Sequence, residues 1–180
     1  MIKQDILSEK DKISLKMIAT RKYKLDKLAL SFVNDKNDII YVRSFLEKIG
    51  ISCEIIAKIE NKNAVKNFDK ILEVSDGIMI ARGDLAVEVG YKSVPYIQKS
   101  CLKKAQNAGK YSIVATQILD SMERNFLPTK AEISDATNAL FEGTSALMLS
   151  GETAVGKYPV DSVKILKTIL DFYEEQQLVM

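Results

Sequence analysis

Histidine is absent from the 180 residues, and cysteine, proline and glycine are scarce, with two, three and eight copies. The lack of histidine excludes imidazole-based triads, histidine zinc sites and imidazole acid–base catalysis. Cys53 and Cys101 lie far apart, without the spacing of a metal or redox motif. Each lies in an apolar segment, so we expect both to be core thiols.

Long apolar runs and blocks of like charge are also missing. Residues 1–5 contain no apolar stretch typical of a signal peptide, and no run is long enough to cross a bilayer. We therefore expect a cytoplasmic protein without a membrane partner. The 26 basic and 24 acidic residues are spread along the chain and give a net charge of +2, which favours no nucleic-acid partner. The densest basic cluster, residues 21–24, is typical of a solvated helix end.

What remains is a composition that is 47% hydrophobic and 28% charged, as in globular proteins. No linker, low-complexity segment or short repeat divides the chain, so we expect a single domain over residues 1–180. Five short apolar segments read as strands, separated by segments with helical periodicity or capping signals. The predicted strands are residues 28–33, 53–59, 77–81, 112–115 and 146–149, with six or seven helices, among them one starting near Gln117.

This alternation predicts an α/β fold in which a parallel sheet is covered by helices. Two architectures fit: an open doubly wound sheet, or part of a (β/α)8 barrel. No glycine-rich dinucleotide fingerprint follows the first strand, which weighs against a nucleotide-binding open sheet. In either fold, function gathers at the carboxyl ends of the strands. Four of the five predicted strands end in polar runs, at residues 57–61, 81–84, 115–117 and 150–153.

Lys58 and Glu60 stand two apart on a strand, so their side chains point to the same face. A structural ion pair is one interpretation of this pair. Asp84, at the end of the next strand, favours another, because two carboxylates without histidine suit a hard cation such as Mg²⁺ or Mn²⁺. Lys58 would then add a second positive charge for a transferring phosphoryl group.

Gly83 and Thr116 suggest how an anion could bind at the same edge. Gly83 has no Cβ, which lets backbone N–H groups approach a ligand closely. Thr116 would offer a hydroxyl at the head of the helix expected near Gln117, where unpaired N–H groups favour anions. A simple helix N-cap explains Thr116 equally well.

At these residues the sequence resembles the pyruvate kinase family. The similar runs occur in order at residues 57–61, 75–85, 115–122, 128–132, 148–154 and 158–159, with weaker similarity at 8–11 and 31–33. The resemblance covers about residues 7–170 and implies the last five strands of a (β/α)8 barrel. Other barrel enzymes also handle phosphoenolpyruvate or pyruvate with Mg²⁺ on two carboxylates. The Ala-Thr-Gln run at 115–117 and the Ser-Gly-Glu-Thr-Ala run at 150–154 favour pyruvate kinase over these.

The resemblance implies phosphoryl transfer from phosphoenolpyruvate to ADP in glycolysis, giving pyruvate and ATP. It assigns Glu60 and Asp84 to the divalent metal, and Lys58 and Thr116 to catalysis. Phosphoenolpyruvate or pyruvate would be bound by Lys58, Ala81, Arg82, Gly83, Asp84 and Thr116.

The family's first three barrel strands carry its K⁺ ligands and have no counterpart in this sequence, and neither do its lid and C-terminal domains. We therefore expect an incomplete catalytic portion with two open sheet edges. It would be a fragment, one half of a split enzyme, or a decayed gene product, and self-association is a fourth outcome. The alternative function is an inactive remnant or a half-barrel that binds a partner. Asn34, Ala86 and Tyr111 depart from the family's usual Arg, Gly and Pro.

Overall fold

The computed structural model describes residues 6–177 of the chain. Its strands form one five-stranded parallel sheet, in which each strand pairs with the next one along the sequence. The predicted alternation of parallel strands with helices is confirmed. The strands are β1 (Lys27–Leu30), β2 (Glu54–Ile59), β3 (Gly77–Ala81), β4 (Tyr111–Ala115) and β5 (Ala146–Met148).

Helices fill the connections, and several begin at capping residues that are recognisable in the sequence. Ser8, Asp35 and Thr129 each form a capping box, and Asn61 accepts the Ala64 amide. The longer helices are α1 (Glu9–Thr20), α2 (Lys36–Lys48), α6 (Val94–Asn107), α7 (Lys130–Phe141) and α9 (Pro159–Gln177). The shorter ones are α3 (Lys62–Lys66), α4 (Phe68–Val74), α5 (Arg82–Val89), α8 (Gly151–Ala154) and the 3-10 helices η1 (Tyr91–Ser93) and η2 (Asp120–Glu123).

Two details of the fold differ from the sequence-based expectation. The first strand ends at Leu30 rather than at residue 33, because Phe32 takes a φ of 57°, which no extended strand allows. Helices α4, α5 and α8 were not predicted, because segments of one or two turns are too short to show a helical period. Within residues 6–177, no helix combines the length and the apolar character needed to span a membrane.

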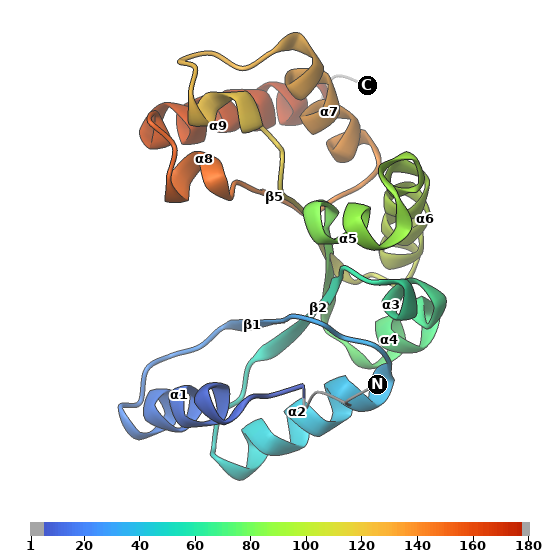
Figure 1. Cartoon of the computed structure of the whole chain (residues 1–180), viewed down its shortest axis with the longest axis vertical. Coiled ribbons are helices and arrows are strands. Elements are labelled where there is room, and N and C mark those ends of the chain that lie inside the picture. The colour runs from blue at the N-terminus through green and yellow to red at the C-terminus, as the bar shows by residue number, and fades with distance from the viewer. Residues whose placement is uncertain (1–5, 178–180) are drawn as a thin grey trace.

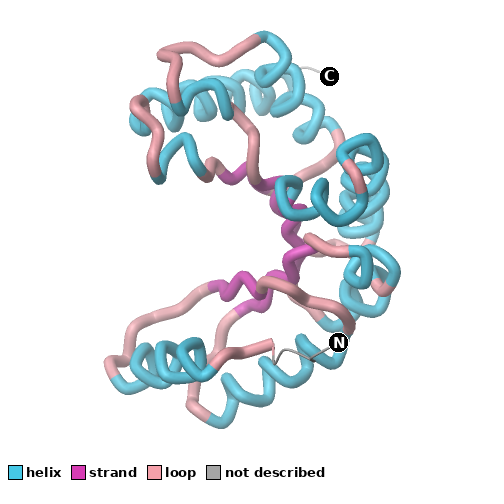
Figure 2. Tube along the Cα trace, in the orientation of Figure 1, coloured by secondary structure: helices cyan, strands magenta, loops and turns pink. Residues whose placement is uncertain are grey.

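The sheet bends into an open arc with β1 near one end and β5 near the other (Figure 1). Figure 2 shows the strands along the inner side of this arc, with helices outside them. A doubly wound sheet would reverse its strand order at a switch point and carry helices on both faces. The sequential order and one-sided helix cover instead match a segment of a barrel. Of the two architectures that the sequence left open, the partial barrel is the one observed.

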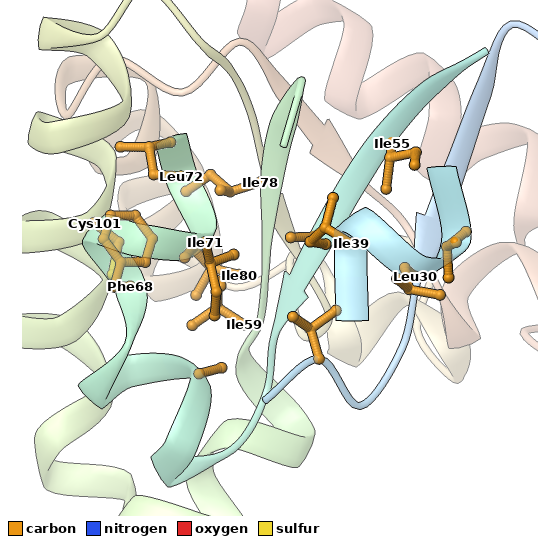
Figure 3. Packing of buried hydrophobic residues seen from close by; sticks show 14 of the residues in the cluster. Leu30, Ile39, Ile55, Ile59, Phe68, Ile71, Leu72, Ile78, Ile80 and Cys101 are labelled. Atoms are coloured by element: carbon orange, nitrogen blue, oxygen red, sulfur yellow. The ribbon is translucent and has the colours of Figure 1, made fainter. Parts of the chain in front are cut away.

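The main core lies between the convex face of the sheet and the helices that cover it (Figure 3). Strand residues such as Ile55 and Ile78 and helix residues such as Ile39 and Cys101 are buried there. Burial raises the pKa of the Cys101 thiol to about 12, so this side chain stays protonated and packs as an apolar group. Cys53 packs against the edge of the same core and is only partly buried, so it is a core thiol only in part.

The concave face carries a smaller cluster of Ile56, Met79 and Ala115. Gly77 is required for this packing, because a Cβ at that position would lie 2.6 Å from the Tyr111 carbonyl oxygen. The same Cβ would lie 2.8 Å from the Ile56 side chain. The absence of a side chain at Gly77 thus leaves room for Ile56 and Tyr111, from the two neighbouring strands, to pack at the amino end of the inner face.

Candidate active site

The carboxyl ends of β2, β3 and β4 meet at one rim of the arc. The strand register sets their relative positions, since Ile59 pairs with Ile80 and Ala81 pairs with Ala115. Glu60 directly follows β2, and Thr116 directly follows β4. All the residues that the sequence predicted for the site lie on or next to the ends of these three neighbouring strands: Lys58, Glu60, Ala81, Arg82, Gly83, Asp84 and Thr116.

Lys58 and Glu60 form an ion pair at this rim. Lys58 Nζ lies 3.0 Å from Glu60 Oε2 and donates a 2.8 Å hydrogen bond to Ser31 Oγ. Glu60 is only 2% exposed, and its Oε1 accepts the Phe32 backbone N–H at 2.7 Å. Glu60 Oε2 is buried and accepts no hydrogen bond, although the Lys58 ammonium lies 3.0 Å away as its ion-pair partner. This oxygen keeps lone pairs that could bind a cation.

Glu60 and Asp84 offer the oxygen donors that a Mg²⁺ or Mn²⁺ ion prefers. Asp84 lies in the first turn of α5 and is exposed, and its side chain forms no hydrogen bond or ion pair with any other residue of the described range. Among residues 6–177, no group of three or more Asp, Glu, Cys or His residues could hold a metal ion. Two carboxylates with an open oxygen fit Mg²⁺, which commonly binds one or two carboxylates and keeps the other positions for water and phosphate.

The start of α5 is capped by Thr116, the residue that follows the neighbouring strand β4. No side chain from the N-cap residue, Ala81, caps this helix, and the Gly83 N–H donates to Thr116 Oγ1 at 2.9 Å. Thr116 and Gln117 have φ values of 70° and 53°, which an α-helix excludes. The prediction of a helix near Gln117 was therefore wrong, and the next helical element is η2. The Thr116 hydroxyl instead lies at the N-terminus of α5.

Arg82 is 9% exposed, and its guanidinium forms hydrogen bonds with other residues of the protein. Its Nε and Nη2 donate to the Thr116 carbonyl at 3.1 and 2.8 Å, and Nη2 also donates to the Gln117 carbonyl at 2.8 Å. Nη1 donates to Asp135 Oδ2 at 2.7 Å. The prediction that Arg82 lines a substrate pocket stays a prediction. Sequence reasoning missed Asp135, since nothing in a helical segment distinguishes it from a surface carboxylate.

Glu152 is a buried carboxylate that holds two loops at the same rim. It is 1% exposed and accepts the Leu119 N–H at 2.9 Å and the Ser150 N–H at 2.7 Å. Because both bonds join a charged acceptor to backbone N–H groups, they are stronger than neutral ones. The sequence signals for Glu152 were its position just after the last strand and its place in the Ser-Gly-Glu-Thr-Ala run at 150–154, but neither predicted this structural role.

Glu132 fixes the segment after Thr116 in a pH-dependent way. It accepts the Ser121 N–H at 2.6 Å, the Ser121 hydroxyl at 2.7 Å and the Thr129 N–H at 2.7 Å. Burial tends to raise the pKa of this carboxyl, but these bonds outweigh burial, and the net pKa is lowered. A lowered folded-state pKa means that the stabilisation is present above the ordinary glutamate range and is lost as the pH falls through the folded-state pKa.

We therefore expect Glu132→Gln to lower the free energy of unfolding by about 1 kcal/mol at pH 7, the size of one capping interaction. Denaturant unfolding at several pH values would measure the difference between the two proteins. The difference should disappear at low pH, where Glu132 itself is protonated. A difference that grows on acidification would contradict this account.

Residues 1–163 match the family model described as the pyruvate kinase barrel domain. The chain belongs to the pyruvate kinase family. It is 51% identical over 152 residues to pyruvate kinase of Bacillus licheniformis, a match covering 84% of this chain and 26% of that relative. It is 42% identical over 174 residues to pyruvate kinase of Methanocaldococcus jannaschii, covering 97% of this chain and 38% of the relative. The chain thus spans well under two thirds of the length of these relatives.

Membership of the pyruvate kinase family confirms that the open arc is part of a (β/α)8-type barrel. Asn34 is the departure from the family pattern that lies nearest to Lys58 and Glu60. Its Nδ2 donates to the Phe32 carbonyl at 2.8 Å, and the Phe32 N–H binds Glu60. Asn34 thus supports the buried end of the pair through the backbone, without the charge of the usual arginine.

The other two departures from the pyruvate kinase pattern take part in packing. Ala86 is partly buried and packs against the main core from α5. Tyr111 begins β4, at the amino end of the sheet, and Lys27 Nζ lies 4.7 Å from its ring centroid. Lys27 also pairs with Glu54 there, so Tyr111 covers a Lys–Glu pair at the edge opposite the rim.

Proposed function

We propose that this chain forms one face of a site that transfers a phosphoryl group from phosphoenolpyruvate to ADP, giving pyruvate and ATP. Membership of the pyruvate kinase family supports the reaction class. One observation supports the position of the site: the buried Glu60 Oε2 accepts no hydrogen bond and lies 3.0 Å from Lys58 Nζ. Such a pair places a carboxylate that can bind a metal ion next to an ammonium that can stabilise a phosphoryl group, and phosphoryl transfer needs both.

Glu60 and Asp84 would hold Mg²⁺ or Mn²⁺, which when bound neutralises charge on the phosphate oxygens. Lys58 supplies an ammonium on the same face and stabilises the charge that spreads over the transferring phosphoryl group. Ser31 orients that ammonium through its 2.8 Å hydrogen bond, so little rearrangement is needed during the reaction. K⁺ is expected for the complete family site, with ligands outside the motifs found in this chain.

Ala81, Arg82, Gly83, Asp84 and Thr116 would line the pocket for phosphoenolpyruvate or pyruvate. Thr116 Oγ1 accepts the Gly83 N–H, which leaves its own O–H free to donate. That hydroxyl is the group we assign to hold the proton that the enolate carbon gains when pyruvate forms. The first turn of α5 adds N–H groups whose dipoles favour a carboxylate or phosphate.

The test is a pyruvate-formation assay with phosphoenolpyruvate, ADP, Mg²⁺ and K⁺. The chain would be assayed alone and together with a polypeptide that carries the first three strands of the family barrel. We expect turnover only in the mixture, because a site built on five strands lacks the groups that face Lys58 across the barrel. Absence of turnover in both samples would overturn the proposal and favour an inactive remnant. Turnover by the chain alone would show that these five strands suffice.

A further inference from the structure

The loop after β4 holds Thr116 in a conformation that its sequence does not favour. Thr116 is β-branched, and a left-handed φ of 70° is rare for such a residue. Gln117 follows with a φ of 53°, so two consecutive non-glycine residues are left-handed. Strain of this kind persists only where the surrounding structure imposes it. The contacts that impose it therefore identify the residues that set the direction of the Thr116 hydroxyl.

Arg82 makes most of these contacts. Its guanidinium donates to the carbonyl of Thr116 through two nitrogens and to the carbonyl of Gln117 through one. Asp135 on α7 fixes the remaining terminal nitrogen at 2.7 Å. A planar guanidinium can serve these acceptors together, whereas a lysine ammonium on a flexible stem cannot reproduce the geometry.

Gly83, the next residue, makes a further contact with Thr116. Its N–H binds Thr116 Oγ1 at 2.9 Å while Arg82 binds the Thr116 carbonyl. Both the backbone and the side chain of Thr116 are therefore held by two consecutive residues at the start of α5. We infer that the Arg82 side chain has a positioning role and acts through Thr116, so that Arg82 would face the substrate only through its backbone. The catalytic consequence rests on the proposed function, whereas the positioning of Thr116 by Arg82 and Gly83 does not.

The positioning of Thr116 can be tested in the chain itself, without substrate, by amide hydrogen exchange resolved by NMR. Arg82→Lys should speed exchange at the Gly83 amide roughly fivefold to tenfold, because its acceptor is no longer held. The Ile55 amide is an internal reference, since it donates to Asp76 Oδ2 at the opposite end of the sheet. Faster exchange at both amides would indicate general loosening and would overturn the inference, as would no change at Gly83. Asp135→Asn is the milder second variant if Arg82→Lys does not fold, with the same selective change expected.

Arg43→Lys is the matched control, because Arg43 also joins a backbone carbonyl, that of Val74, to a carboxylate, that of Asp76. It should leave the Gly83 amide unchanged. A double-mutant cycle with Thr116→Val gives the decisive readout. Thr116→Val removes the acceptor, so adding Arg82→Lys should change Gly83 exchange no further, and additive effects would refute action through Thr116.

Turnover separates positioning from substrate contact. In the mixture assayed for pyruvate formation, Arg82→Lys should lower kcat about tenfold and leave KM for phosphoenolpyruvate within about twofold, because an interaction made in the transition state is weakened. A rise in KM with unchanged kcat would instead assign Arg82 to substrate binding. If the unmodified protein gives no turnover, the proposed function fails. Hydrogen exchange still shows whether Arg82 positions Thr116.

Discussion

Lys58→Met is expected to reduce pyruvate formation by roughly a hundredfold to a thousandfold, the usual effect of removing one charged group aimed at a transition state. Methionine keeps the length and apolar stem of lysine, so the change removes the ammonium with little loss of packing. Divalent metal binding should be preserved, because Glu60 and Asp84 are both retained. The coupled assay in the completed barrel would measure kcat, and Mn²⁺ titration would measure metal affinity.

Lys27→Met is the matched control for this experiment. Lys27 also belongs to a Lys–Glu pair, with Glu54, but at the opposite end of β1 and β2 from the rim. Its loss should change kcat by less than about twofold, because no reacting group is expected there. Unchanged turnover in Lys58→Met would remove Lys58 from the mechanism. Equal losses in both variants would point to damage to the sheet instead.

Glu60→Gln is expected to weaken Mn²⁺ binding to the chain tenfold or more, because a neutral amide oxygen replaces a charged ligand. The fold should survive, since a glutamine oxygen can still accept the Phe32 N–H that Glu60 Oε1 binds at 2.7 Å. Electron paramagnetic resonance of free Mn²⁺ would follow the titration directly and needs no turnover. The readout therefore tests the metal assignment separately from the reaction.

Glu54→Gln and Asp84→Asn complete that series. Glu54 is the carboxylate of the other Lys–Glu pair, that with Lys27. Its replacement by Gln should leave the Mn²⁺ affinity unchanged. Asp84→Asn should weaken Mn²⁺ binding about as much as Glu60→Gln if both carboxylates hold one ion. Full affinity in Glu60→Gln would contradict the proposed site. Weakening by Glu54→Gln alone would move the metal to the amino end of the sheet.

Local signals in the sequence predicted much of the fold. Short apolar runs identified the strands because side chains buried on both faces leave little room for polar residues. Capping boxes marked the starts of α1 and α7 because their hydrogen bonds involve residues only three apart. Glycines such as Gly50 marked helix ends, since a φ of 75° suits a residue without Cβ. These features depend on near neighbours, which a sequence displays directly.

The sequence by itself determined which chemical groups are present and that strand ends would bring Lys58, Glu60 and Asp84 to one rim. Only the tertiary structure decided how those groups are held. Glu60 Oε1 accepts the backbone N–H of Phe32 from a neighbouring strand end, and the Arg82 side chain binds Asp135, 53 residues away. Thr116 has a left-handed φ that opposes its own local preference, and it is contacted there by Arg82 and Gly83, more than 30 residues away. Such partners are set by strand register and helix packing, which no local pattern records.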